Sequence, residues 1–572
     1  MIVNWKSLLQ SAKSIDVTQK QKVNVYVLGD MSTQFYARGL QKAGQLLGLN
    51  LVVVDGPFDQ MELQFLDHNS ELHQSPSDCV VLLFSKQAFQ KVFQRLDPNK
   101  KSSFAHDQLA KLQQYLSMIA SKRCIVSNVI EEEEGVFGSL GNTHQHSFLY
   151  QLRRFNFLLM EWVGKESNAQ ILDVKLFHSR SGDEVFLDPR NEYLSSMAFS
   201  LDGNAILAFQ TAKLIAAGCG IFKKCLILDL DNTLWGGVIG DDGISKIEIG
   251  DLGVGKAFTA IQNWAKALKS RGIILAVCSK NEESIAQEPF LSHPQMVLSL
   301  DDISVFVANW NNKADNIRHI QQVLNIGFDS MVFLDDNPAE RQLVREQLPD
   351  VTVPELPEDP AFFLQTLKSL NLFETQAISA LDQERTKMYQ QEAKRVAALK
   401  EYTDLDSYLG ALEMEGEILE LDEQNLPRVS QLFQRSNQFN LRTIRYQEAD
   451  LRSLAKAGNH LIYCYTLSDK FGFHGIISAV VLEKQEQHLY IDNWVMSCRV
   501  LKRGVEYFIL QHLRQVAEEL GVCELRGSYL PTPKNRIVAH LLDDLGFEKR
   551  IDYSMFAVKH QKIKDHHIKS RK

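Results

Sequence analysis

The sequence predicts an α/β protein with two consecutive parallel-sheet domains and a C-terminal α+β domain. Short apolar runs rich in Val, Ile and Leu alternate with longer helical patterns over the first 375 residues, which is typical of parallel strands covered on both faces. From about residue 421 several strands come first and a helix follows, as in an α+β domain. The length of 572 residues allows roughly three to five domains of about 100–200 residues each.

Composition and charge narrow the class of protein. Hydrophobic residues make up 45% and charged residues 23% of the chain, as in globular proteins, and the formal net charge is −9. This acidic balance argues against a nucleic acid partner, because nonspecific binding of nucleic acid needs clustered positive charge. We also expect no membrane association, since the most apolar stretch, residues 205–222, is interrupted by Gln210, Lys213 and two glycines.

The eight cysteines predict a reducing compartment. They include no CxxC pair and no His/Cys cluster at metal-ligand spacing, so neither a disulfide framework nor a structural zinc site is expected. The first residues show no basic segment followed by an apolar core. We therefore expect a cytoplasmic protein.

The first predicted domain covers residues 1–220. Its parallel strands are expected in four apolar runs, at residues 23–30, 51–56, 79–84 and 124–130. A helix around residues 204–217 is expected to close the domain.

The second predicted domain covers residues 221–375, and a connector is expected over residues 376–420. The strands of the second domain are expected at residues 223–231, 272–280 and 330–336. The connector is charged and has a mostly helical pattern.

The third predicted domain covers residues 421–560. Its strands are expected in LIYCYTL, GIISAVVLEK, HLYIDNWVMS and CELRGSYL, and its main helix in VEYFILQHLRQVAEEL. The last residues, 561–572, are basic and polar, so we expect a frayed tail.

Two aspartates at the end of the strand at 223–231 carry the strongest chemical signal. Asp229 and Asp231 in LDLDNTLWGG are two residues apart, so their side chains leave the strand on the same side. Two carboxylates in an apolar neighbourhood repel each other unless a cation lies between them. Because ligands of open α/β sheets bind at the carboxyl ends of the strands, the pair predicts a cation-dependent site there; a capped strand end is the alternative.

Three further motifs follow along the chain. CSKN contributes Ser279 as a hydrogen-bond donor, and NWNNKADNI contributes Lys313 as a fixed cation. LDDNP contributes Asp335 and Asp336, whose oxygens suit Mg²⁺. A nucleophile, a hydroxyl, a lysine and metal carboxylates on successive strand tips predict a phosphoryl-transfer site, which outweighs the capping alternative.

These four motifs resemble those of the haloacid dehalogenase (HAD) superfamily of phosphotransferases. The resemblance implies that Asp229 is the nucleophile that takes the phosphoryl group as an aspartyl-phosphate. It implies that Asp231 is the general acid and base, and that Ser279 and Lys313 hold the phosphoryl oxygens.

The resemblance also implies a Mg²⁺ cofactor. Asp229, Asp231 through its backbone carbonyl, and Asp335 or Asp336 match the metal ligands of the superfamily, and spacing leaves open which of the last two binds directly. No insertion of the size of a large cap domain separates the first two motifs. A Rossmann-like HAD domain without a large cap is therefore implied.

The longer pattern resembles the FkbH-like subfamily, most clearly from residue 223 to about residue 547. The resemblance is carried by LDLDNTLWGGVIGDDG, AVCSKN, NWNNKADNI, FLDDNPAER, VPELPEDPAFF, RSNQFNLRTIRY and SCRVLKRGVE. It implies that a glyceryl unit passes from a phosphorylated three-carbon acid, such as 1,3-bisphosphoglycerate, to the thiol of an acyl carrier protein with dephosphorylation, as in polyketide biosynthesis. A stand-alone HAD phosphatase with inert flanking domains and a non-catalytic scaffold for carrier proteins are the alternatives.

The C-terminal domain resembles a GNAT-type acyltransferase. Its CRVLKRGVE segment places Arg499, Lys502, Arg503 and Gly504 at an expected helix N-terminus, where backbone N–H groups favour a phosphate. The resemblance implies the phosphopantetheine arm of a carrier protein as the ligand, and a basic surface at a helix start is the alternative. Cys498, next to Arg499, is a candidate for a transient acyl-thioester, or else an inert cysteine.

Two further candidates are weaker. His474 in DKFGFHG is a possible base or a packed histidine. The N-terminal sheet resembles a degenerate SGNH-hydrolase domain without the GDS motif. Ser32 with His144 or His146 would be its hydrolytic set, and we expect a structural or carrier-docking role instead.

Overall fold

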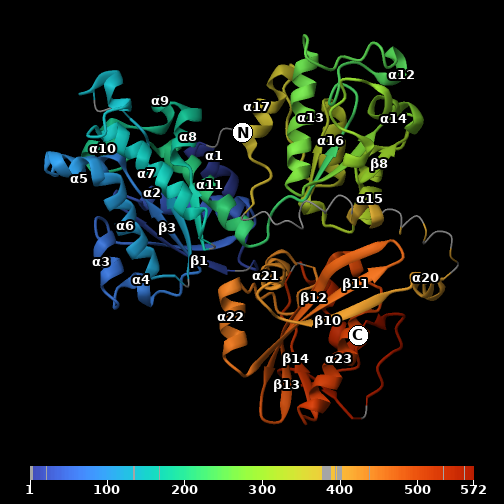
Figure 1. Ribbon diagram of the computed structural model, residues 1–572. Coiled ribbons are helices and arrows are strands. Elements are labelled where there is room, and N and C mark those ends of the chain that lie inside the picture. Colours follow the sequence, from blue (N-terminus) through green and yellow to red (C-terminus); the bar gives the residue numbers. More distant parts are fainter. Residues whose placement is uncertain are drawn as a thin grey trace. The chain divides into compact units, whose positions relative to one another are not determined.

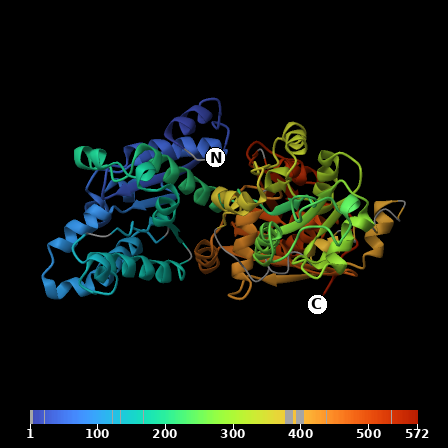
Figure 2. The ribbon, with the colours of Figure 1, turned by 90° about the horizontal axis from the view of Figure 1, so that it is seen from above.

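The structure, a computed structural model, describes residues 4–571 apart from residues 21, 121, 133–134, 167, 376–387, 393–394, 396–397, 399–401, 403, 437, 533 and 560. The chain divides into two compact units, Met1–Cys219 and Gly220–Lys572, coloured blue to teal and green to red in Figure 1 and Figure 2. The second unit contains both the HAD-like and the C-terminal region. Part of the predicted connector, including residues 376–387, lies outside the described residues.

The first unit contains a five-stranded parallel sheet in the order β2-β1-β3-β4-β5. Its strands are β1 (Lys22–Gly29), β2 (Asn50–Asp55), β3 (Cys79–Leu83), β4 (Arg123–Ser127) and β5 (Ala169–Leu172). The four predicted strands are confirmed, and β5 is an additional strand. Every residue of β3 is buried, as expected for a strand covered on both faces.

Helices cover both faces of this sheet (Figure 1), which confirms the predicted three-layer arrangement. One layer holds α1 (Trp5–Ala12), α2 (Gln34–Leu46) and α11 (Leu201–Gly218), and the other holds α5 (Lys86–Gln94), α6 (Phe104–Ser117) and α7 (Phe148–Val163). Tyr36 of α2 donates a hydrogen bond to Thr211 of α11 at 2.6 Å. Phe89, Phe104 and Phe155 pack on the other face. The remaining helices are α3 (Met61–Leu66), α4 (Glu71–Gln74), α8 (Val174–Ser181), α9 (Asp183–Phe186) and α10 (Pro189–Ser195).

The HAD-like region has a four-stranded parallel sheet in the order β8-β7-β6-β9. Its strands are β6 (Cys225–Leu228), β7 (Ile274–Ser279), β8 (Val305–Ala308) and β9 (Met331–Leu334). Its helices are α12 (Ile239–Asp242), α13 (Gly255–Ser270), α14 (Glu283–Ser292), α15 (Lys313–Leu324), α16 (Pro338–Gln347) and α17 (Phe363–Leu370). The three predicted strands are confirmed, and β8 is an additional strand.

Alternate residues of β6 belong to two separate cores. Leu226 and Leu228 pack with residues of α13 and α17, whereas Cys225 and Ile227 pack with residues of α15 and α16. Because side chains alternate along a strand, β6 is buried on both faces. Polar side chains therefore gather at the strand ends, and the candidate site lies there.

The C-terminal region contains an eight-stranded mixed sheet, which confirms the predicted α+β fold. The sheet order is β15-β16-β14-β13-β12-β11-β10-β17. The strands are β10 (Glu415–Glu420), β11 (His460–Asp469), β12 (Gly472–Lys484), β13 (His488–Met496), β14 (Glu524–Gly527), β15 (Glu548–Lys549), β16 (Ser554–Ala557) and β17 (Lys569–Ser570). The helices are α20 (Leu405–Ala411), α21 (Leu426–Arg435), α22 (Glu448–Lys456), α23 (Val505–Glu519) and α24 (Leu541–Asp544).

The prediction of a frayed tail is wrong. Strand β17 pairs in parallel with β10, and Ile568 before it is only 5% exposed within the core of the C-terminal domain. Burial of this isoleucine and the unpaired edge of β10 explain why the basic segment is ordered. Strand β10 itself lies in the predicted connector, so the sheet begins earlier than expected. None of the helices in the described part of the chain is both long and apolar enough to cross a membrane.

Candidate functional site

The carboxyl ends of three adjacent parallel strands bring the predicted site residues together. Strand β6 lies between β7 and β9, and Leu228 pairs in register with Leu334. Asp229 and Asp335 directly follow these paired residues, and the Asp229 N–H donates to the Leu334 carbonyl at 2.9 Å. Ser279 is the last residue of β7. The parallel register thus produces the cluster that the spacing predicts.

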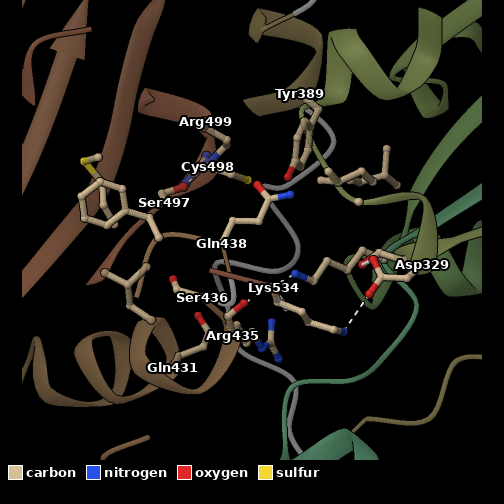
Figure 3. A pocket seen from close by; sticks show the side chains of 18 of the residues that line it. Asp329, Tyr389, Gln431, Arg435, Ser436, Gln438, Ser497, Cys498, Arg499 and Lys534 are labelled. Atoms are coloured by element: carbon tan, nitrogen blue, oxygen red, sulfur yellow. Dashed lines mark hydrogen bonds and ion pairs between the residues drawn. The ribbon is translucent and has the colours of Figure 1, made fainter. Parts of the chain in front are cut away.

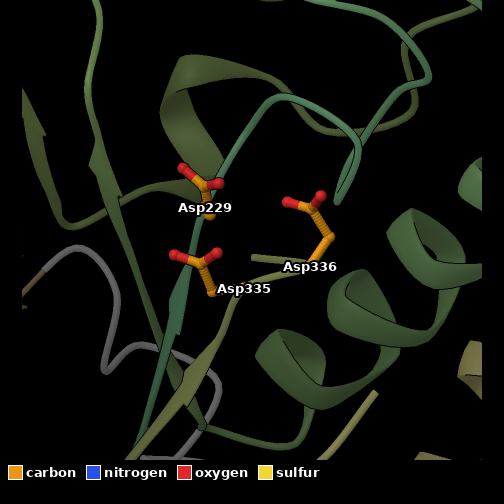
Figure 4. Close-up of side chains that lie close together, drawn as sticks. All are labelled: Asp229, Asp335 and Asp336. Carbon is orange, nitrogen blue, oxygen red and sulfur yellow. The ribbon is translucent and has the colours of Figure 1, made fainter. Parts of the chain in front are cut away.

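Three carboxylates form a compact acidic cluster (Figure 4). Asp229, Asp335 and Asp336 each place an oxygen within 4.8 Å of the others. Asp335 is fully buried, Asp229 is 6% exposed and Asp336 is half-buried. Such oxygen ligands suit a hard divalent cation such as Mg²⁺. Among the described residues, Lys313 is the lysine that forms ion pairs with this cluster. One positive charge against three carboxylates fits a bound divalent cation.

Lys313 is the cation inside this cluster. Its Nζ lies 2.9 Å from Asp229 Oδ1 and 2.5 Å from Asp335 Oδ2, and the side chain is buried. Lys313 begins α15, which is capped by Asn312, so the helix start fixes its position. Burial lowers the pKa of Lys313, but Asp229 and Asp335 outweigh it and raise that pKa above its usual range.

Opposing effects act on the pKa of the Asp229 carboxyl. Burial raises its pKa to about 7; Lys313 opposes this shift and Asp335 adds to it. Burial and the neighbouring Asp335 also raise the pKa of Asp336. A divalent cation would reverse this tendency, because it stabilises the charged carboxylates.

Asp231 is held beside the acidic cluster. Its Oδ1 accepts from Trp235 Nε1 at 2.9 Å and from the Ile239 N–H at 3.0 Å. Its Oδ2 accepts from Asn281 Nδ2 at 2.9 Å. The Asp231 carboxylate is not among the clustered metal-ligand atoms of the described residues, which leaves its backbone carbonyl as the group that the family resemblance assigns to the metal.

Asn281 is a site residue for which the sequence predicted no role. Its Nδ2 donates to Asp231 and also lies 3.1 Å from Ser279 Oγ. Both Asn281 and Ser279 are buried. Its spacing of two residues from Ser279 in CSKN was the available signal, because that spacing favours one side of the chain.

Arg341 is a second such residue, and its guanidinium holds the backbone of Asp335 and Asp336 in place. Its guanidinium donates to the carbonyl oxygens of Asp335 at 2.9 Å and Asp336 at 2.6 Å, and it pairs with Glu355 at 3.0 Å. The Thr233 hydroxyl accepts from the Asp336 N–H at 3.1 Å. These contacts fix the backbone that carries the Asp335 and Asp336 carboxylates of the acidic cluster.

The four residues predicted to bind a phosphopantetheine phosphate do not form one cradle. Gly504 caps α23 with a φ of 77°, and Lys502 is exposed, as expected at such a helix start. Arg503, however, is buried and pairs with Glu392 at 2.7 Å and Asp469 at 3.2 Å. Arg499 points elsewhere, with its guanidinium 2.6 Å from Met388 Sδ. The guanidinium of Arg503 is therefore occupied by internal carboxylates.

His474 belongs to the same buried ionic cluster. Its Nε2 lies 3.0 Å from Asp469 Oδ2. Arg395 donates two hydrogen bonds of 2.7 Å to the Asp469 carboxylate. Burial lowers the pKa of His474 to about 4, and the hydrogen bond with Asp469 only partly opposes this shift. His474 is thus a packed, neutral histidine at pH 7.

Two sets of candidates remain, Cys498 in the second unit and Ser32 with His144 or His146 in the first. Cys498 is half-buried, and its carbonyl accepts from Asn325 Nδ2 at 2.5 Å. In the first unit the Ser32 N–H donates to the Ser196 carbonyl, whereas His144 stacks on Phe137. Among the described residues, no hydrogen bond joins Ser32 to His144 or His146.

The parallel sheet and its strand tips define a protein with a HAD-type carboxylate site. Comparisons with known proteins identify the family of the chain. The model of the FkbH N-terminal domain matches residues 24–216. A crystal structure of the N-terminal part of BF1531 from Bacteroides fragilis, which contains a phosphatase domain and is complexed with Mg, is 44% identical; the match covers 66% of this chain and 100% of that chain, with a TM-score of 0.63. The chain belongs to the FkbH-like family.

The other comparisons add little. The ribosomal-protein-S18-alanine N-acetyltransferase from Escherichia coli is 15% identical, and the match covers 26% of this chain and 96% of that chain with a TM-score of 0.21. A score this low carries no argument, and the α+β fold of the C-terminal domain rests on its own sheet order. No curated protein matches the chain.

Proposed function

We propose that the chain is a cytoplasmic, Mg²⁺-dependent phosphatase that acts on an acyl group loaded onto a carrier protein. The observation that carries the proposal is the cluster of Asp229, Asp335 and Asp336 around Lys313, with Asp231 held separately beside it. Mg²⁺, when bound, supplies charge neutralisation and polarises phosphoryl oxygens. The eight free cysteines suit a reducing compartment.

The phosphatase step uses two carboxylates in different roles. An Asp229 oxygen attacks the phosphorus of a phosphate monoester, and the bond from phosphorus to the ester oxygen breaks while Asp231 gives that oxygen a proton. Asp231 then takes a proton from water, which attacks the aspartyl-phosphate and releases inorganic phosphate. The fixed hydrogen bonds from Trp235 and Asn281 keep Asp231 in place for both transfers.

The loading step joins a three-carbon acyl unit to sulfur. A thiolate attacks the acyl carbon of a phosphorylated glyceric acid activated as an acyl phosphate, such as 1,3-bisphosphoglycerate, and the carbon–oxygen bond to phosphate breaks. The carrier thiol is the final acceptor, and Cys498 is a candidate for accepting the unit first. Membership of the FkbH-like family supports this step.

Intact-protein mass spectrometry of a holo acyl carrier protein tests the proposal. After incubation with 1,3-bisphosphoglycerate and Mg²⁺, the carrier should gain a glyceryl group with the unaltered protein and a phosphoglyceryl group with Asp229→Asn. Phosphate release from small esters with no change in carrier mass would favour a stand-alone phosphatase. An unchanged carrier and no phosphate release would favour a scaffold.

A further inference from the structure

A cavity of about 360 Å³ lies between the HAD-like and C-terminal domains of the second unit. Figure 3 shows side chains from both domains around it. Asp329 comes from the HAD-like domain, and Arg435, Cys498 and Lys534 come from the C-terminal domain. The volume lies in the range of small-molecule sites, which often form at domain interfaces.

The cavity lies at the opposite end of the HAD-like sheet from the acidic cluster. Its lining includes Lys224 just before β6, Ile274 at the start of β7 and Ser330 just before β9. The acidic cluster follows the other ends of β6 and β9. Strands of four to six residues separate the two places by about 13–20 Å at ~3.3 Å per residue. The cavity is therefore a separate site.

The walls of the cavity are basic although the chain as a whole carries a charge of −9. Two acidic residues, Asp329 and Asp350, face five basic ones. The basic residues are Lys224, Arg428, Arg435, Arg499 and Lys534. Burial would raise the pKa of Asp329, but Lys534, Lys224 and Lys223 outweigh it and lower that pKa. Lys534 pairs with Asp329 at 2.7 Å. Five basic against two acidic side chains still leave an excess of positive charge at this wall, which favours an anionic ligand.

The rest of the wall suits an organic group. Ile274, Phe328, Phe439 and Met496 contribute apolar surface. The Ser436 side chain adds a group that can donate or accept hydrogen bonds. A ligand with a charged end and a short organic body matches both parts of the wall better than a bare ion does.

We propose that this cavity binds a small organic phosphate, with its phosphate among the basic side chains and its organic part beside Cys498. The phosphate could belong to a free phosphorylated acid or to a phosphopantetheine arm, because both present the same group to the cavity. The choice of these two ligands rests on the proposed function. Their binding to the cavity requires neither Mg²⁺ nor catalysis.

Titration calorimetry on the Asp229→Asn protein in EDTA tests binding while the metal site is inactive. The probes are 3-phosphoglycerate, 4′-phosphopantetheine and inorganic phosphate, so the two organic sources are compared with the bare ion. At least one organic phosphate should bind saturably and more tightly than inorganic phosphate. Absence of saturable binding by both would overturn the proposal, even if phosphatase activity is found.

Substitutions of basic residues that line the cavity test where the organic phosphate binds. Lys534→Gln and Arg435→Gln should each weaken it about tenfold, because each removes a charge-assisted hydrogen bond. Lys559→Gln removes an exposed lysine that does not line the cavity, so it is the matched control. Weakening by Lys502→Gln but not by Lys534→Gln or Arg435→Gln would move the site to the start of α23 and contradict the proposal.

Alkylation of cysteines tests independently where the organic phosphate binds. Cys498 lines the cavity, whereas Cys523 is exposed elsewhere. The bound organic phosphate should slow the reaction of Cys498 with iodoacetamide and leave that of Cys523 unchanged, as measured by peptide mass spectrometry. Equal rates at Cys498 with and without a saturating ligand would contradict the assignment.

Discussion

The amide of Asn281 lies between two side chains with different tasks, Asp231 and Ser279. Asn281→Ala should lower kcat for phosphate release about tenfold or more, because a hydrogen bond to a charged group is worth ~1.5–3 kcal/mol. Steady-state phosphate assays measure the effect. Asn263→Ala, which removes an exposed asparagine on α13, is the matched control, and an unchanged kcat in folded Asn281→Ala would contradict this role.

Asp335 and Asp336 are adjacent but differently held. Asp335 is buried and fixed by Lys313 and by the Asn337 N–H at 2.8 Å, whereas Asp336 is half-buried. A preorganised carboxylate contributes more to metal affinity, so Asp335→Ala should raise the Mg²⁺ concentration for half-maximal activity more than Asp336→Ala. Magnesium titrations of both variants decide this, and the reverse order would assign the main ligand role to Asp336.

At the scale of elements, the long apolar runs were predictable and the short or charged strands were not. Residues such as Val80 to Leu83 in β3 form a continuous apolar run that is typical of a buried strand. Strand β5 has only four residues, and its two central ones, Gln170 and Ile171, are half-buried. Strand β10 carries three glutamates, and its strand conformation depends on pairing with β11 and β17. These segments form strands because they pair with other segments of the chain. The local sequence pattern carries no signal of that pairing.

The ionic cluster that joins β11 and β12 should make the C-terminal domain sensitive to acid. His474 has an ordinary pKa of 6.5 when unfolded and about 4 when folded. The unfolded state therefore binds the proton first, and stability is lost as pH falls from 6.5 to 4, by up to about 3 kcal/mol.

Urea unfolding at pH 7 and pH 4.5 measures this effect. His474→Gln should show a smaller loss of stability over that interval than the unaltered protein, since it removes the group that takes up the proton. An equal loss in both proteins would assign the acid sensitivity to other groups. His512, whose pKa burial also lowers to about 4, would be the next to test.

At the scale of the whole molecule, the acidic cluster was predictable and its surroundings were not. The carboxyl ends of parallel strands meet at one edge of a sheet, so the sequence alone places Asp229, Ser279 and Asp335 together. The pairing of Arg503 with Glu392 depends on how a distant segment packs. The cavity depends on the packing of two domains. Local spacing holds no information about either.

Phosphate release by Asp229→Asn tests the central claim most directly. This change keeps the size of the side chain and removes its nucleophilic charge, so release from a phosphate ester in Mg²⁺ should fall to background while the thermal melt still shows a folded protein. Asp241→Asn, at an exposed position in α12, should retain full activity. Substantial phosphate release by folded Asp229→Asn would contradict the assignment of Asp229 as the nucleophile.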